Sequence, residues 1–278
     1  MDDTRGDSRA VAGLRRRLRE GQVVVGPFMK FGDAAAAEIM GLAGFDYVII
    51  DLEHGPLSVE TAQGLVRAAR LAGAAPVIRV AANAGPDILR ALDVGAEGVQ
   101  VPHVDSAEAA EQAVRYARYH PEGERGVCRY VRAAGYSSED RFRYFARANE
   151  ETCVVLHIEG REGLERLEEI LTVPGVDVVF LGPYDLSQSL GVPGQVRHPA
   201  VIERMLEAVR RARAAGVAVG TFADDVTVAR EWVMLGVQYI SYSVDVGILY
   251  EACRRAASEI KESSGEDTEE RYGSDGEA

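Results

Sequence analysis

Residues 46–56 read DYVIIDLEHGP, an apolar run that ends abruptly in three ionisable side chains, Asp51, Glu53 and His54. The run is short and rich in β-branched residues, which is typical of a buried strand. Charged side chains at one end of such a strand belong at the edge of a sheet, where water and ligands have access. The stretch therefore predicts a strand whose carboxyl end contributes to a functional site.

Similar apolar runs recur along the chain, and segments with helical spacing separate them. The segment VETAQGLVRAARLAG (59–73), for example, places apolar residues at helical intervals and ends in glycine. Apolar strands that alternate with helices indicate a parallel sheet covered on its outer face, and about eight strands are what a closed barrel needs. We therefore predict an α/β fold, a single-domain (β/α)8 TIM barrel, in preference to a doubly wound sheet. The predicted strands are 23–29, 47–51, 75–80, 97–102, 152–159, 176–183, 216–222 and 239–245.

The chain is expected to have three parts. Residues 1–20 form an N-terminal helical extension, residues 21–260 form the barrel, and residues 261–278 are an acidic tail. The tail is glycine-rich and nearly free of apolar residues, so we expect it to be disordered. A long interval between the fourth and fifth predicted strands, residues 119–151, contains several aromatic residues and is a candidate loop over the barrel mouth.

Composition narrows the class of ligand. The 278 residues are 47% hydrophobic and carry a formal net charge of −13. A surplus of carboxylates argues against a nucleic-acid partner, and no apolar run has the roughly 18 to 20 residues that a membrane span requires. The N-terminus lacks the apolar centre of a signal peptide. We therefore expect a soluble, cytoplasmic protein that binds a charged or polar small molecule, with three cysteines (Cys128, Cys153 and Cys253) that are buried and inert.

In a TIM barrel the working residues lie at the carboxyl ends of the strands. Beyond the opening stretch, this rule selects Arg79, His103, His157, Glu159 and Asp185. Each has a structural alternative: Arg79 could bridge carboxylates, His103 could cap a helix, and Asp185 could be a helix N-cap. Their coincidence at strand ends indicates a site.

Two of these residues have the chemistry of metal ligands. Glu159 and Asp185 follow neighbouring predicted strands, and two carboxylates supply hard oxygen ligands while leaving positions for water and substrate. The pair favours Mg²⁺ or Mn²⁺. Because His157 lies on the same strand face as Glu159 and could add a nitrogen ligand, Co²⁺ or Zn²⁺ remains an alternative metal.

Four collinear stretches carry a resemblance to a known family. They are FDYVIIDLEHGP (45–56), GAEGVQVPHVDSAEAAEQAVRYARYHPEGERGV (95–127), HIEGREGLERLEEIL (157–171) and VDVVFLGPYDLSQSLGVPGQVRHPAV (176–201). Together they resemble the HpcH/HpaI aldolases, metal-dependent class II pyruvate aldolases of the 2,4-dihydroxyhept-2-ene-1,7-dioate aldolase kind, from about Val23 to about Ala256. The resemblance implies a barrel whose final helix packs on a neighbouring subunit, in a trimer or a homohexamer.

The resemblance also implies roles for individual residues. His54 would be the acid/base residue, Arg79 would lie beside the oxygens of the ketoacid, and Asp51 and Asp93 would lie near the histidine. His157 stands where close relatives usually carry glutamine. The implied sets are His54, Arg79, Asp51 and Asp93 for catalysis; Arg79, His157, Gly182, Pro183, Tyr184 and Asp185 for substrate binding; and Glu159 and Asp185 for the metal.

The implied activity is that of a divalent-metal-dependent carbon–carbon lyase. It would cleave or form a 2-oxo-4-hydroxy acid, with a 2-oxoacid and an aldehyde as partners, through a pyruvate-type metal enolate. No Schiff-base lysine is needed, and Lys30 is the one lysine near a strand end. The alternative is a decarboxylase or lyase of an oxaloacetate-like acid, which requires the same groups; a non-catalytic barrel is the alternative outside enzymes.

Two arginines of the long interval leave alternatives open. Arg129 and Arg132 would suit an acidic or phosphorylated acceptor, or they are solvated and pair with Glu139 or Asp140.

Overall fold

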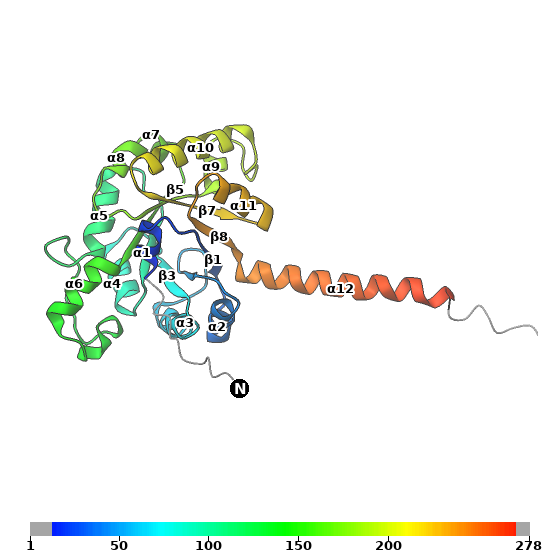
Figure 1. Cartoon of the computed structure of the whole chain (residues 1–278), viewed down its shortest axis with the longest axis horizontal. Helices are drawn as coiled ribbons and strands as arrows, with labels where there is room; N and C mark the ends of the chain where they lie inside the picture. The colour runs from blue at the N-terminus through cyan, green and yellow to red at the C-terminus, as the bar shows by residue number, and fades with distance from the viewer. Residues whose placement is uncertain (1–12, 271–278) are drawn as a thin grey trace, which may run out of the picture.

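The protein forms a closed barrel of eight parallel strands, in which each strand pairs with the next and β8 pairs with β1 (Figure 1). This computed structural model describes residues 13–270, with side chains up to residue 261. The prediction of a (β/α)8 TIM barrel is confirmed, and each predicted strand is present to within two residues at either end. The strands are β1 Val24–Met29, β2 Tyr47–Asp51, β3 Ala75–Arg79, β4 Gly98–Val101, β5 Cys153–Ile158, β6 Val178–Leu181, β7 Ala218–Ala223 and β8 Tyr239–Val244.

Helices follow the strands and cover the outside of the barrel. Several begin at a side chain that caps the helix: Ser58 accepts a hydrogen bond from the N–H of Thr61, and Ser106 accepts one from Ala109. The helices are α1 Leu14–Arg19, α2 Ala34–Leu42, α3 Val59–Leu71, α4 Gly85–Asp93, α5 Ala107–Ala117, the 3-10 helix η1 Arg132–Ser137, α6 Arg141–Glu151, α7 Arg161–Glu165, α8 Leu167–Leu171, α9 Pro183–Ser189, α10 Pro199–Ala214, α11 Val226–Met234 and α12 Asp245–Glu270.

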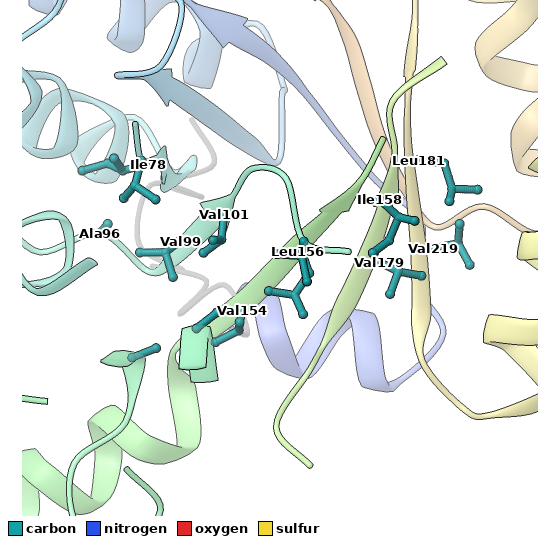
Figure 2. Close-up of a cluster of buried hydrophobic side chains, with 14 of the residues drawn as sticks. Ile78, Ala96, Val99, Val101, Val154, Leu156, Ile158, Val179, Leu181 and Val219 are labelled. Atoms are coloured by element: carbon teal, nitrogen blue, oxygen red, sulfur yellow. The ribbon is translucent and has the colours of Figure 1, made fainter. Parts of the chain in front are cut away.

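Side-chain alternation along the strands produces two separate cores. On β5, Val154, Leu156 and Ile158 point outward and pack under the helices, together with outward residues of β4, β6 and β7 (Figure 2). The intervening residues Cys153 and Val155 belong to the core inside the barrel. The same alternation directs His157 into the barrel interior, so the polar end of β5 continues the inner core rather than the outer one.

Large aromatic residues fill the barrel interior, and glycine makes room for them. The rings of Tyr47 and Tyr239 stack with their centroids 4.2 Å apart. A Cβ atom on Gly26 would lie 2.0 Å from the carbonyl oxygen of Tyr47, and one on Gly220 would lie 2.7 Å from the Phe180 ring. Small residues on β1 and β7 therefore let the rings of β2, β6 and β8 meet.

The first described helix, α1, closes the N-terminal end of the barrel. Its Leu14 and Leu18 join the inner core. Arg15 on the same helix is buried, and its Nε lies 2.7 Å from Asp177 Oδ1, while Arg118 Nη2 lies 3.3 Å from Asp177 Oδ2. The buried charges of Arg15, Arg118 and Asp177 at this end are thus paired with one another.

The long interval lies at the N-terminal end of the barrel. It leaves the C-terminal end of α5 and returns at the start of β5, and both of these lie at the end opposite the mouth. Its helices η1 and α6 contact α4 and α1. The prediction that this segment covers the mouth of its own barrel is wrong, because connections from helix to strand lie at the N-terminal face.

The last helix, α12, projects from the barrel as a long rod (Figure 1). It runs to Glu270, so residues 261–270, which were expected to be disordered, are helical; residues 271–278 lie outside the described part of the chain. No helix of the described residues is both long and apolar enough to cross a membrane. Of the cysteines, Cys153 is buried as expected, whereas Cys128 and Cys253 are exposed.

Candidate active site

A cavity of about 280 Å³ opens at the carboxyl ends of the strands. Its wall is partly apolar, with Phe28, Phe180, Phe222 and Val244, and partly ionic. A larger cleft of about 610 Å³ lies at the other end of the barrel, beside η1 and α6. We take the smaller cavity as the candidate site because it gathers most of the predicted residues, namely Asp51, Arg79, His157, Glu159, Gly182, Pro183, Tyr184 and Asp185.

A buried ion pair forms one wall of the site. The guanidinium of Arg79 donates from Nε to Asp51 Oδ1 at 2.9 Å and from Nη2 to Asp51 Oδ2 at 2.7 Å. Both residues end neighbouring strands, and the barrel register places them side by side. Burial alone would raise the pKa of the Asp51 carboxyl, but the hydrogen bonds and charge of Arg79 outweigh it and lower the pKa. The pair is therefore ionised and fixed in orientation.

Glu53, a candidate at the end of the second strand to which the sequence assigned no specific role, is part of this wall. Its Oε2 lies 3.0 Å from Arg79 Nη1, and its Oε1 lies 3.2 Å from His103 Nε2. The backbone N–H groups of Glu53 and His54 both donate to Asp51 Oδ1 at 3.1 Å, which folds the chain after β2 into a tight turn. This turn brings two carboxylates to one arginine, an arrangement that the spacing of Asp51 and Glu53 along the sequence could have suggested.

His54 follows the end of β2 but does not line the cavity. Its side chain is 61% exposed, and its Nε2 lies 3.9 Å from Glu53 Oε2. The structure does not bring Asp93 to it: Asp93 ends α4, at the opposite end of the barrel, and accepts a hydrogen bond from Arg125 Nη2 at 2.8 Å. Burial raises the pKa of Asp93 against the effect of Arg125. Within one chain, the expectation that Asp93 lies near the histidine is wrong, because a helix carries it away from the mouth.

Glu159 is the carboxylate at the centre of the cavity. Its Oε1 contacts His157 Nδ1, and its Oε2 lies 3.2 Å from His103 Nδ1 without a hydrogen bond. Burial would raise the pKa of Glu159, but the contacts with His157, His103 and Arg79 lower it to about 2. Glu159 is thus ionised, buried, and equipped with one oxygen that has no hydrogen-bond partner.

The segment after β6 supplies the other acidic ligand candidate. Gly182 is the N-cap of α9, and Asp185 lies in the first turn, so the alternative of Asp185 as an N-cap is wrong. A Cβ on Gly182 would lie 3.0 Å from Glu159 Cγ, which is tighter than ordinary contact, so glycine eases the close approach of this turn to the carboxylate. Tyr184 donates to Asp224 Oδ2 at 2.7 Å, and burial together with this bond raises its pKa to about 12.

Two further residues belong to the mouth. Lys30, at the end of β1, lines the cavity with its Nζ 4.0 Å from Asp51 Oδ2. His103 has a left-handed backbone (φ 53°), and its ring bridges Glu53 and Glu159. It does not cap α5, whose N-cap is Ser106. The position of Lys30 and His103 at strand ends could be read from the sequence. Their acidic partners, Asp51, Glu53 and Glu159, are known only from the structure.

The two arginines of the long interval lie away from this cavity. Arg132 borders the large cleft at the N-terminal end, where burial and the neighbouring Arg70 and Arg67 lower its pKa. Arg129 packs on Tyr130. Neither pairs as expected, because Glu139 binds Arg147 and Asp140 caps α6. Within one chain, neither arginine lines the cavity of the candidate active site.

The fold and the ionic mouth define a TIM-barrel enzyme whose site combines buried carboxylates with a fixed arginine. The model of the HpcH/HpaI aldolase/citrate lyase family matches residues 25–252, and the chain belongs to this family. It is 36% identical over 250 residues to the hydroxypyruvate/pyruvate aldolase of Roseobacter denitrificans, which covers 90% of this chain and 97% of that protein. It is 38% identical to the 2-keto-3-deoxy-L-rhamnonate aldolase of Escherichia coli O9:H4, over 86% of this chain and 89% of the relative.

A solved structure agrees with this result. An HpcH/HpaI aldolase/citrate lyase family protein from Burkholderia cenocepacia J2315 superimposes with a TM-score of 0.85 at 37% identity, covering 89% of this chain and 98% of that one. The family, the fold and the aldolase class that were predicted from the sequence are therefore confirmed. The protein is a carbon–carbon lyase of the aldolase type.

Proposed function

We propose that the protein is a divalent-metal-dependent aldolase that forms the enolate of a 2-oxoacid and joins it to, or releases it from, an aldehyde. The observation that carries the proposal is Oε2 of Glu159, a buried oxygen of an ionised carboxylate that lies 3.2 Å from His103 Nδ1 but has no hydrogen-bond partner, in the cavity that Asp185 also lines. Both relatives named above are aldolases of 2-oxoacids by their names. These observations together favour a 2-oxoacid as the donor substrate.

The donor set fits a hard cation. Among the described residues, no group of three or more His, Cys, Asp or Glu side chains converges as a ready-made metal centre. Mg²⁺ and Mn²⁺ do not need one, since they bind through one or two carboxylates and keep water and substrate as further ligands. We therefore propose that Glu159 and Asp185 hold the ion. When bound, such an ion supplies Lewis acidity toward the carboxylate and keto oxygens of the substrate.

The chain's own residues would carry the remaining tasks. Arg79 is held by Asp51 and Glu53, so its charge is fixed near the cavity before substrate arrives and can stabilise an oxyanion without reorganisation. The turn from Gly182 to Asp185 borders the same cavity, and its amides are candidates to bind the substrate carboxylate; Pro183 has none. His54 is exposed, so it can exchange protons with water, as an acid/base group must.

Oligomerisation belongs to the same proposal. The projecting helix α12 exposes Leu249 (53%) and Tyr250 (64%), which supports packing against another copy of the chain in a trimer or hexamer. An orienting role of Asp93 toward His54 would require such a second copy. We further propose a cytoplasmic enzyme without nucleic-acid or membrane partners.

The test is hydrogen–deuterium exchange at the methyl group of pyruvate, followed by NMR. Chelator-treated protein should show no exchange, and adding Mg²⁺, Mn²⁺, Co²⁺ or Zn²⁺ one at a time should restore it. Glu159→Gln and Asp185→Asn should abolish the metal-restored exchange. The matched control is Asp224→Asn, a carboxylate of the same cavity that binds Tyr184 and should keep most activity. Exchange that persists in both ligand variants would refute the metal pair, and no exchange with any ion would refute the pyruvate donor.

A further inference from the structure

A line of hydrogen-bonding side chains crosses the barrel interior and ends at Glu159. Tyr239 of β8, Gln100 of β4 and His157 of β5 are all buried, with exposed fractions of 0%, 0% and 1%. Tyr239 Oη donates to Gln100 Oε1 at 3.2 Å. Gln100 Nε2 contacts His157 Nε2, and His157 Nδ1 contacts Glu159 Oε1. These four residues thus form a continuous series of contacts that leads from β8 through β4 and β5 to Glu159.

The donors and acceptors of this line follow one direction. Tyr239 donates to the amide oxygen of Gln100, and the amide nitrogen of Gln100, which can only donate, faces Nε2 of His157. An ionised carboxylate can only accept, so Nδ1 of His157 carries a proton toward Glu159. The line therefore runs from the Tyr239 hydroxyl to Glu159.

The line also fixes how Glu159 is presented to the cavity. The His157 ring stacks on Phe180 with centroids 4.4 Å apart and planes at 17°, so the ring has little freedom to rotate. With Oε1 bound to this ring, Oε2 is the oxygen that is left without a hydrogen-bond partner. Groups behind a ligand that hold it in this way typically change metal affinity 10- to 100-fold when removed.

We propose that Tyr239 and Gln100 are positioning residues that act through His157 on Glu159 and fix the orientation of its metal-binding oxygen. The inference rests on the proposed function for the identity of Glu159 as a ligand. The direction of the hydrogen bonds stands on the geometry of the barrel interior alone.

The first test compares two buried tyrosines. Tyr239→Phe removes the hydroxyl that begins the line, whereas Tyr144→Phe removes one that bonds to Tyr119 at 3.1 Å in a separate cluster. Both tyrosines are buried, so the variants lose comparable groups. Mn²⁺ affinity of the chelator-treated full chain, measured by titration calorimetry, should fall about tenfold in Tyr239→Phe and change less than twofold in Tyr144→Phe. Equal affinities in the two variants would overturn the proposal.

Two variants of His157 separate positioning from packing. His157→Gln keeps an N–H donor for Glu159, whereas His157→Phe keeps a ring against Phe180 and removes the donor. We expect Mn²⁺ affinity to fall more in His157→Phe than in His157→Gln, by about tenfold or more. An affinity in His157→Phe equal to that of the wild type would show that the hydrogen bond does not position the ligand.

The hydrogen bond from His157 to Glu159 gives a readout that needs no metal. In protein labelled with ¹⁵N-histidine, the signals lost in His157→Gln identify His157, and the Nδ1 signal should show a bound proton. An Nδ1 without a proton would contradict the direction of the line. If the wild type bound no divalent cation, the proposed function and the positioning role would both fail, and the spectrum would still decide the direction of the hydrogen bonds.

Discussion

Asp51→Asn should destabilise the protein strongly, because it leaves the Arg79 guanidinium buried beside a neutral amide. Asp51 is fully buried, and the Arg79 side chain is 10% exposed. Breaking one partner of a buried ion pair costs about 3 to 5 kcal/mol. Glu53 remains 3.0 Å from Nη1 and compensates part of the charge, so we expect the lower end, about 3 kcal/mol. For a chain of this size that corresponds to a fall in Tm of roughly 6 to 12 °C.

The pH dependence of this loss has a definite sign. The folded-state pKa of Asp51 is lowered, so its ionised pair stabilises the protein above the unfolded-state pKa of about 3.9, and the stabilisation disappears as pH falls toward the folded-state value. Urea unfolding of wild type and Asp51→Asn at equal protein concentration should therefore show a constant difference from pH 7 to 5 and a shrinking one below about pH 4. A difference under 1 kcal/mol at pH 7, or one that persists unchanged at low pH, would refute the reasoning.

Three other predictions concern the fold and the site. Gly26→Ala should cost about 1 to 3 kcal/mol in urea unfolding, because the added Cβ meets the backbone of β2, whereas Gly64→Ala, in α3 with open space around it, should stabilise by up to about 1 kcal/mol. Arg79→Lys keeps the charge but loses the fork that binds the carboxylates, and kcat/KM for aldol cleavage should fall about 10²-fold; unchanged kinetics would argue against a fixed guanidinium. Asp177→Asn leaves Arg118 buried without its partner at the closed end, so stability should fall by about 3 kcal/mol with unchanged Mn²⁺ affinity; an altered affinity would show that the two ends are coupled.

The barrel itself could be predicted because its signal is local and repeated. Each strand is a short apolar run, each helix has an apolar face, and their alternation leaves few architectures open. The site was partly predictable for the same reason: Asp51, Arg79, Glu159 and Asp185 directly follow or end such runs, and the carboxyl ends of parallel strands converge. Position along the chain was therefore enough to select these residues.

The partners of these residues could not be predicted, because they depend on distances across the barrel. Nothing in the sequence near Gln100 or Tyr239 signals a polar role, and both would pass for ordinary strand residues. The misplacement of Asp93 has the opposite cause: it was taken from the resemblance alone, whereas the helix that contains it runs away from the mouth. Helix direction, and not sequence distance, decides which end of a barrel a residue reaches.

Strand register links the stability of this barrel to its chemistry. Along β5 the inward residues are Cys153, Val155 and His157, and the outward residues are apolar. A slip of one residue would turn His157 outward and bring Ile158 to the position beside Gln100. The same slip would bury an imidazole under the helices without a hydrogen-bond partner, at a cost of several kcal/mol. The outer apolar core therefore protects the inner polar line against this slip, because the one-residue shift that disrupts the line also disrupts the packing.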